Sequence, residues 1–163
     1  MSDGSVQGQR SGVKGQGYQQ LLAWQRAHQL ALAVYRSTNS LSSRDGWLRS
    51  QIVRAAVSVP ANVAEGYSRD SLKEYLHFLS IARGSLAEVE YYVLFIRDAG
   101  LLPEETGEKL DALRRESGRL LLGLMRSLRE ADAKQARGPR QVGEEHVDYI
   151  LQDLSIEPLT RDP

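Results

Sequence analysis

Residues 71–100 have the sequence SLKEYLHFLSIARGSLAEVEYYVLFIRDAG, which carries the longest helical periodicity in the chain. Its apolar residues recur at alternating intervals of three and four positions, which places them on one face of an α-helix. This stripe contains Leu72, Tyr75, Leu79, Ala82, Leu86, Val89, Val93 and Ile96. Ser71 and Glu74 have the spacing of a capping box, and Gly100 is typical of a C-terminal cap. The segment predicts one amphipathic helix that begins near Ser71 and ends at Gly100.

Three other segments on either side of this helix show the same period. A first stripe contains Trp24, Ala27, Ala31, Val34, Thr38 and Leu41. A second stripe contains Leu48, Ile52, Ala55, Val59 and Val63, and a last one, after Pro103, contains Leu110, Leu113, Leu120, Leu124 and Leu128. Pro60 lies inside the second segment, where we expect a kink rather than a stop because the apolar pattern continues past it. Four such helices with short loops predict an all-α, antiparallel up-and-down four-helix bundle.

The two ends of the chain lack this periodicity. Residues 1–17 are rich in Gly, Gln and Ser and predict a disordered leader, so the bundle is expected to occupy residues 18–130. Residues 131–163 predict an acidic flexible tail with one apolar cluster, which includes Tyr149, Ile150, Leu151 and Leu154. This tail either docks loosely on the bundle or carries a short linear motif that folds against a partner.

Composition excludes several classes of protein. The chain has 163 residues, of which 41% are hydrophobic, and its formal net charge is zero. It contains no cysteine, which excludes disulfides and cysteine-ligated metals and fits a reducing cytoplasm. No apolar run approaches the roughly 20 residues that span a bilayer, and the N-terminus does not resemble a signal peptide. We therefore expect a cytoplasmic protein that does not enter a membrane.

The charge is unevenly distributed along the chain. Residues 18–129 contain 15 Lys and Arg against 12 Asp and Glu, whereas residues 130–163 contain 4 basic and 8 acidic residues. A mildly basic bundle with an acidic tail is a weak indication of contact with nucleic acid.

No catalytic arrangement emerges from the residue pattern. A di-iron bundle needs two Glu-x-x-His pairs, but only Glu74 and His77 have this spacing, and the first helix offers Gln25 and His28 instead. The two histidines are better explained as interface or rim residues. No phosphate-binding loop, nucleophile elbow or dinucleotide fingerprint is present. We expect no enzyme activity, no cofactor and no metal site.

Two smaller features have simple interpretations. Arg140 and His146 have the Arg-x5-His spacing of some helical ribonucleases, but they lie in the predicted tail, where no scaffold would hold both groups for catalysis. Gly84 and Ser85 interrupt the third helix, where small residues favour close helix–helix contact.

The third helix has apolar residues on more than one side. Those outside its main stripe are Ile81, Tyr91, Tyr92, Leu94 and Phe95. A single bundle cannot bury all of them, and soluble monomers rarely expose such a patch. The sequence therefore predicts self-association, with Ile81, Tyr91, Tyr92 and Phe95 at the interface between copies.

Basic residues cluster in sequence on both sides of Pro60. They are Arg49, Arg54, Arg69, Lys73 and Arg83, and Tyr67 beside them could stack on a base. The alternative is a solvated basic face whose arginines pair with Glu65 and Asp70. If the cluster is functional, nucleic acid is its expected ligand.

Long stretches of the chain resemble a known family. They are YQQLLAWQRAHQLALAVYRST at 18–38 and SQIVRAAVSVPANVAEGYSRDSLKEYLHFLSIARGSLAEVE at 50–90, followed by the leucine-rich helix. Within them, RAAVSVPANVAEGY, KEYLHFL and GSLAEVE form a long and specific motif. These segments are similar to the bacterial four helix bundle protein family, which includes proteins encoded in intervening sequences of large-subunit ribosomal RNA genes. It also includes the accessory variability determinant of diversity-generating retroelements.

This resemblance implies a four-helix protomer that assembles as a ring-like homopentamer. For the retroelement accessory protein it also implies binding to nucleic acid and to a reverse transcriptase. Arg54, Arg69 and Lys73 match basic positions of the family, whereas Val53 stands where arginine is common. We expect a non-catalytic, homo-oligomeric helical scaffold that binds RNA or DNA as an accessory factor, with a reverse transcriptase as one possible partner. The alternative is a protein–protein interaction scaffold that binds no nucleic acid.

Overall fold

The computed structural model describes residues 17–136, and all regular structure within this range is helical. The four α-helices are α1 (Leu22–Ser37), α2 (Gly46–Tyr67), α3 (Leu72–Asp98) and α4 (Glu104–Ala136). Three short 3-10 helices accompany them, namely η1 (Gly17–Gln20), η2 (Thr38–Ser40) and η3 (Ser43–Asp45). The predicted all-α class is confirmed.

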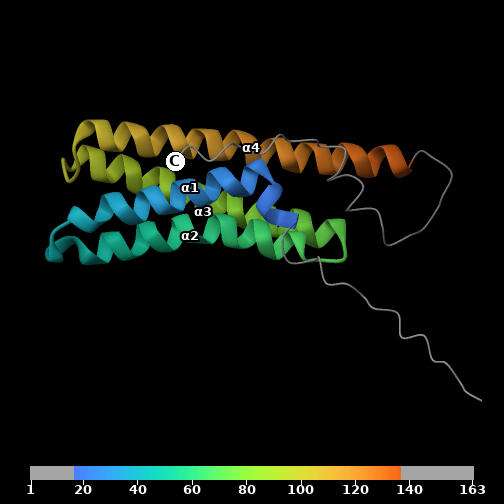
Figure 1. Cartoon of the computed structure of the whole chain (residues 1–163), viewed down its shortest axis with the longest axis horizontal. Coiled ribbons are helices and arrows are strands. Elements are labelled where there is room, and N and C mark those ends of the chain that lie inside the picture. Colours follow the sequence, from blue (N-terminus) through green and yellow to red (C-terminus); the bar gives the residue numbers. More distant parts are fainter. Residues whose placement is uncertain (1–16, 137–163) are drawn as a thin grey trace, which may run out of the picture.

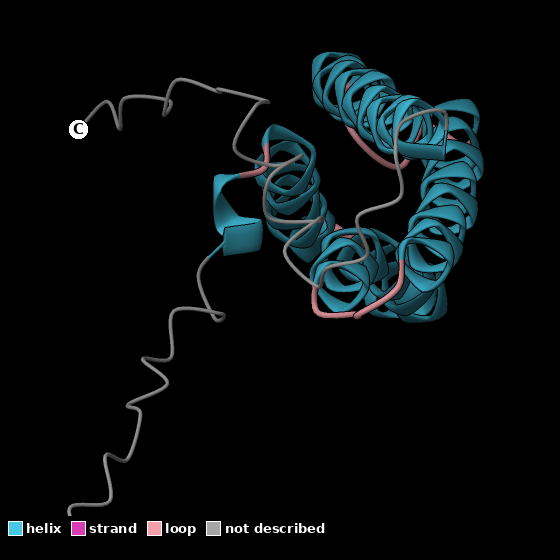
Figure 2. Ribbon diagram, turned by 90° about the vertical axis from the view of Figure 1, so that its right-hand side faces the viewer, coloured by secondary structure: helices cyan, strands magenta, loops and turns pink. Residues whose placement is uncertain are grey.

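The α-helices form an antiparallel up-and-down bundle (Figure 1). Each helix packs against its neighbours in sequence, and α4 closes the arrangement by packing against α1. The end-on view in Figure 2 shows the helices arranged around a common axis. The α2/α3 pair therefore lies on the side of the bundle opposite the α1/α4 pair, and this separation organises the surfaces described below.

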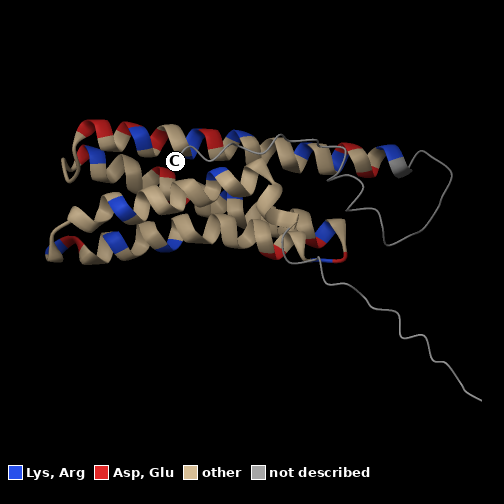
Figure 3. Ribbon diagram, viewed as in Figure 1, with Lys and Arg blue, Asp and Glu red and all other residues tan. Residues whose placement is uncertain are grey.

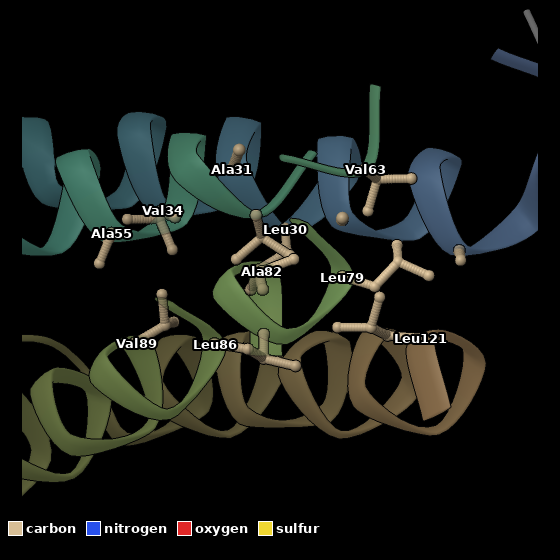
Figure 4. Packing of buried hydrophobic residues seen from close by; sticks show 14 of the residues in the cluster. Leu30, Ala31, Val34, Ala55, Val63, Leu79, Ala82, Leu86, Val89 and Leu121 are labelled. Atoms are coloured by element: carbon tan, nitrogen blue, oxygen red, sulfur yellow. The ribbon is translucent and has the colours of Figure 1, made fainter. Parts of the chain in front are cut away.

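The core is built from the apolar stripes of all four helices (Figure 4). In the view shown, Leu30 of α1 lies against Ala82 of α3, Val34 of α1 lies on the side of Val89, and Leu121 of α4 lies below Leu79. Almost every member of the predicted third stripe is buried, including Tyr75, Leu79 and Ile96. Burial of these side chains is the main stabilising contribution, because each large apolar side chain removed from water adds about 1.5–3 kcal/mol.

Small residues bring α2 and α3 close together. The Ser85 hydroxyl donates a hydrogen bond to the Ser58 hydroxyl at 2.9 Å, across the helix pair. At the end of α2, a Cβ atom on Gly66 would lie 2.7 Å from Cδ2 of Tyr75, so only glycine fits there. Helix α2 also continues through the buried Pro60, as predicted. Ser85 thus has the role expected from the sequence.

Both predicted caps of the third helix are present. The Ser71 hydroxyl accepts a hydrogen bond from the Glu74 amide at 3.2 Å. At the other end, Gly100 has a φ of 65°, which L-residues with side chains rarely adopt. The amide of Gly100 donates to Arg97 O, and the amide of Leu101 donates to Ile96 O. This pair of bonds is a Schellman motif, and it reverses the chain toward α4.

Two helix boundaries differ from the predicted ones. Helix α1 ends at Ser37, so Thr38 and Leu41 lie beyond it, although Thr38 is buried and its hydroxyl donates to Val34 O at 2.7 Å. This bond satisfies a backbone carbonyl in the last turn of α1. Because Thr38 is buried, the stripe also continues past the end of the helix. Helix α4 continues to Ala136, past the predicted boundary at residue 130, because no helix breaker occurs before Gly138 and Pro139. Most of the predicted leader and tail lies outside the described residues.

Ion pairs join α4 to both of its neighbours. Arg26 Nε of α1 lies 2.9 Å from Glu116 Oε1, and Arg114 Nη1 lies 3.1 Å from Glu90 Oε2 of α3. Arg114 also contacts Asp111 at 2.9 Å. Partly exposed pairs of this kind contribute little free energy, and they fix the register of α4 against the apolar core more than they stabilise it.

Replacing the cap glycine tests this description of the α3–α4 turn. Gly100→Ala should lower the free energy of unfolding by about 1–2 kcal/mol, because alanine at positive φ is strained. Gly123→Ala is the matched control, since an added Cβ there meets nothing within 4 Å. It should raise stability by up to about 1 kcal/mol through helix propensity. Urea unfolding measures both, and a shift of the same sign for the two variants would contradict the assignment.

Candidate functional site

An apolar surface runs along α2 and α3 on the outside of the bundle. Its large side chains are Trp47 and Val57 of α2 and Ile81, Tyr91 and Phe95 of α3, all exposed. Trp47 and Tyr91 are each 59% exposed and Phe95 is 38% exposed. The ring centroids of Trp47 and Phe95 lie 6.3 Å apart, and those of Tyr91 and Phe95 lie 6.4 Å apart. We call these five residues the α2/α3 face.

One predicted interface residue is placed differently from the other three. Tyr92 is half-buried and packs against the bundle core, although its ring lies 5.6 Å from that of Tyr91. It therefore borders the α2/α3 face rather than belonging to it. The interpretation of Gly84 as a contact between helices of the same bundle is wrong, because Gly84 is exposed and an added Cβ would meet nothing within 4 Å.

The α2/α3 face also contains one pair of opposite charges. Arg54 Nη2 lies 3.8 Å from Glu88 Oε2, and it donates to Gln51 Oε1 at 2.8 Å. Arg54 thus already has two partners, an amide oxygen and a carboxylate. This environment suits a polar contact within a protein interface better than an open phosphate-binding surface.

The other predicted basic residues do not form one patch. Arg49 donates to Asn39 Oδ1 at 2.6 Å and lies 5.3 Å above the ring of Tyr35. Arg69, at the opposite end of α2, pairs with Glu65 and lies 4.8 Å above the ring of Phe78. The length of α2 between these arginines is about 27 Å. Both guanidinium groups already have local partners.

Lys73 and Arg83 remain exposed on α3 and make no ion pair among the described residues. Arg83 follows Ile81 by two positions, which turns it by roughly 200° around the helix and away from the α2/α3 face. The predicted basic residues are therefore close to Pro60 in the sequence but do not lie close together in space. The predicted cluster is distributed over the whole length of the bundle.

A set of cations on α4 was missed by the sequence reasoning. Figure 3 shows charged residues concentrated along α4, while α1–α3 are mostly uncharged in this view. In the second half of α4 the basic residues are Arg119, Arg126, Arg129 and Lys134. None of them makes an ion pair with a residue that the structure describes. Their wide spacing in sequence hid them, because only helical geometry brings Arg119, Arg126 and Arg129 within about 80° of one another around α4.

A groove lies between the start of α1 and the second half of α4. Its volume is about 290 Å³ and it is open to solvent, with mostly apolar walls. The lining residues are Leu21, Leu22, Ala23, Arg119, Leu120, Gly123, Leu124, Arg126 and Ser127. Two of the unpaired arginines of α4 thus stand at its edge. The apolar pattern of the sequence does not indicate this α1/α4 groove.

Aromatic side chains gather where α2 meets α3, near the start of α1. Tyr75 is buried, and its ring lies 6.3 Å from that of Tyr67, which in turn lies 6.4 Å from Tyr18. The Tyr75 hydroxyl has no hydrogen-bond partner among the described residues. Burial raises the pKa of Tyr75 well above its usual range, and the nearby Tyr67 adds to this effect. The Tyr75 phenol therefore stays neutral within the core.

The described residues offer no site for metal chemistry. No group of three His, Asp or Glu side chains among them is arranged to hold a metal ion. His28 is exposed and stacks on Trp24 with ring centroids 4.9 Å apart, while His77 contacts Phe78 edge-on. Within the described range, no helix has the length and apolar content needed to cross a membrane.

Comparison with known proteins identifies the family. The model of the 23S rRNA-intervening sequence proteins matches residues 19–123, which is most of the bundle. The chain belongs to this family. Its fold is also similar to a crystal structure of a protein with unknown function from the S23 ribosomal protein family of Bacteroides thetaiotaomicron VPI-5482. That likeness has a TM-score of 0.59 at 20% identity and covers 64% of this chain and 98% of the other. No curated protein matches significantly.

Alkaline unfolding tests the environment of Tyr75 in this 23S rRNA-intervening sequence protein. The folded state favours the neutral phenol, whereas the unfolded chain loses the phenol proton near the ordinary tyrosine pKa of about 10. The free energy of unfolding is therefore constant with respect to Tyr75 below this pH and falls as the pH rises above it. Tyr75→Phe should remove much of this loss while leaving stability near neutral pH almost unchanged. Tyr35→Phe, which removes an exposed hydroxyl, is the control. The midpoints of urea unfolding at neutral and alkaline pH measure this effect. If both variants lose the same stability at alkaline pH, the raised pKa of Tyr75 is refuted.

Proposed function

We propose that this member of the family is a non-catalytic, homo-oligomeric helical scaffold whose copies assemble through the α2/α3 face. The observation that supports assembly is the exposure of Trp47, Val57, Ile81, Tyr91 and Phe95 on α2 and α3, with Phe95 beside both Trp47 and Tyr91. The family resemblance implies a ring of five copies. The absence of cysteine fits action in the reducing cytoplasm.

The chemistry of the α2/α3 face favours a protein partner. Aromatic residues are enriched in the central, desolvated parts of interfaces, where a few of them provide most of the binding free energy. A face with three large aromatic side chains in contact has this composition. Arg54 and Glu88 would supply a polar pair within it, with register as their main contribution.

The position of Gly84 also supports close approach by a second copy. Glycine inside a helix lowers stability by roughly 1 kcal/mol relative to alanine, and nothing in the bundle requires it here. Gly84 lies between Ile81 and Tyr91 on the exposed side of α3. A missing side chain at this point would let the backbone of a neighbouring helix approach, as small residues do at other helix–helix contacts.

Binding of nucleic acid is the second candidate function. It is favoured by the unpaired cations of α4 and by the family's description as 23S rRNA-intervening sequence proteins. Glu130 and Asp132 lie among these cations and reduce their excess, so the affinity of one copy should be low and sensitive to salt. As an accessory factor, such a scaffold would bring RNA or DNA to a partner enzyme, for which the resemblance suggests a reverse transcriptase. Without nucleic acid, the same scaffold would organise proteins alone.

A charge placed on the α2/α3 face tests assembly. Phe95→Asp should weaken self-association by at least about 30-fold, because loss of an interface anchor changes binding by 2 kcal/mol or more. Leu122→Asp on α4 is the control, since it places the same charge at another exposed apolar residue, on a different side of the bundle. Sedimentation measures the mass against the 18.2 kDa protomer. A monomeric wild-type protein, or equal effects of both variants, would refute this interface.

Charge reversal on α4 tests nucleic-acid binding separately. Arg129→Glu with Lys134→Glu should weaken binding to a structured RNA and reduce the slope of log affinity against log salt by roughly 2. Arg36→Glu with Arg44→Glu changes the same charge at exposed positions away from α4. Filter binding at several salt concentrations gives the slopes. If wild type binds neither RNA nor DNA at low salt, the protein-only scaffold remains.

A further inference from the structure

The α1/α4 groove has free space along an apolar floor. Leu22 and Leu120 are only half-buried on its walls, and an added Cβ on Gly123 would meet nothing within 4 Å. The groove lies opposite the α2/α3 face, so assembly through that face would leave it open. An apolar groove with room for side chains suits an amphipathic segment that buries its own apolar stripe.

The edge of the groove is positively charged. Arg119 and Arg126 are two helical turns apart on α4, and neither pairs with a described acidic residue. The N-terminus of α1 lies at the same place, where Leu21 provides no side-chain cap and the first turn has no acidic residue. Its free amides add a partial positive charge. The groove therefore selects an occupant that is apolar on one side and acidic on its flanks.

The chain itself contains a segment of this kind after α4. Val147, Ile150, Leu151 and Leu154 recur with intervals of three, one and three, the pattern of one apolar helical face. The surrounding acidic residues are Glu144, Glu145, Asp148, Asp153 and Glu157, and residues 144–157 contain no Lys or Arg. This composition complements both the floor and the edge of the groove.

The length of the chain allows the segment to reach the groove. Ala136, at the end of α4, lies about 20 Å along the helix axis from Gly123. Residues 137–146 can span up to roughly 33 Å when extended. Gly138, Pro139 and Gly143 in this connection favour the reversal of direction that the path requires. Because the segment is tethered, its effective concentration is high and a weak contact suffices.

We propose that residues 147–157 dock in the α1/α4 groove of their own chain. The apolar stripe covers Leu22, Leu120 and the space above Gly123, while the acidic flanks face Arg119, Arg126 and the first turn of α1. This intramolecular contact does not depend on assembly through the α2/α3 face, and it would compete with nucleic acid for Arg119 and Arg126.

Photo-crosslinking of the full-length protein tests the contact. The chain has no cysteine, so Ser155→Cys places a thiol-reactive photo-crosslinker at one position only. Docking predicts crosslinks to peptides containing residues 21–23 or 119–127, in a product with the mass of a single chain. Crosslinks in a two-chain product would overturn the proposal in favour of a neighbour's segment. Crosslinks elsewhere, or none, would overturn it as well.

Two sets of variants make the test specific. Gly123→Phe fills the groove and should reduce the crosslink yield at least about tenfold, whereas Gly123→Ala leaves room and should retain it. In the segment, Ile150→Ser with Leu151→Ser, and separately Asp148→Asn with Asp153→Asn, should each reduce the yield without touching the bundle. Amide hydrogen exchange should then increase both in residues 147–157 and around Gly123. A yield that none of these changes affects would disprove docking in this groove.

Discussion

The close approach of α2 to α3 is the constraint on which the rest of the structure depends. Small residues such as Ser58, Ser85 and Gly66 line the contact, and a larger side chain at Gly66 would overlap Tyr75. The two helices meet over small side chains. The large residues on their outer surfaces therefore cannot shield one another from solvent. Trp47 and Phe95 touch at their ring edges and still remain exposed. Tight packing inside the pair thus creates the apolar face outside it.

Much of the fold followed from periodicity, because the same spacing that buries a stripe also identifies its helix. The caps at Ser71 and Gly100 were equally accessible, since each depends on local geometry alone. Surfaces were harder to predict. Gly84 was assigned to the wrong helix contact because the sequence does not show which side of α3 faces α2. Arg49 and Arg69 looked like neighbours but lie at opposite ends of α2, where each has its own partner.

The α1/α4 groove could not have been found from sequence, because its walls come from residues about one hundred positions apart. In the sequence, Leu120 belongs to the apolar stripe of the last helix, and only the packing of α1 on α4 leaves both Leu120 and Leu22 half-covered. Arg119 and Arg126 are seven positions apart and do not form a cluster in the sequence. The tertiary structure brings these residues together in one groove. The groove favours an apolar segment with acidic flanks, which neither helix would select alone.

The antiparallel arrangement gives the bundle two opposite sides, α2/α3 and α1/α4. An assembly through α2 and α3 would place α1 and α4 on its periphery, and every added copy would repeat the charged surface of α4 there. A long polymer could then bridge several copies at once. Avidity from such repetition can exceed the strength of any single contact by orders of magnitude. Although each protomer is weakly charged, the affinity of the assembly for such a polymer would then increase with the number of subunits.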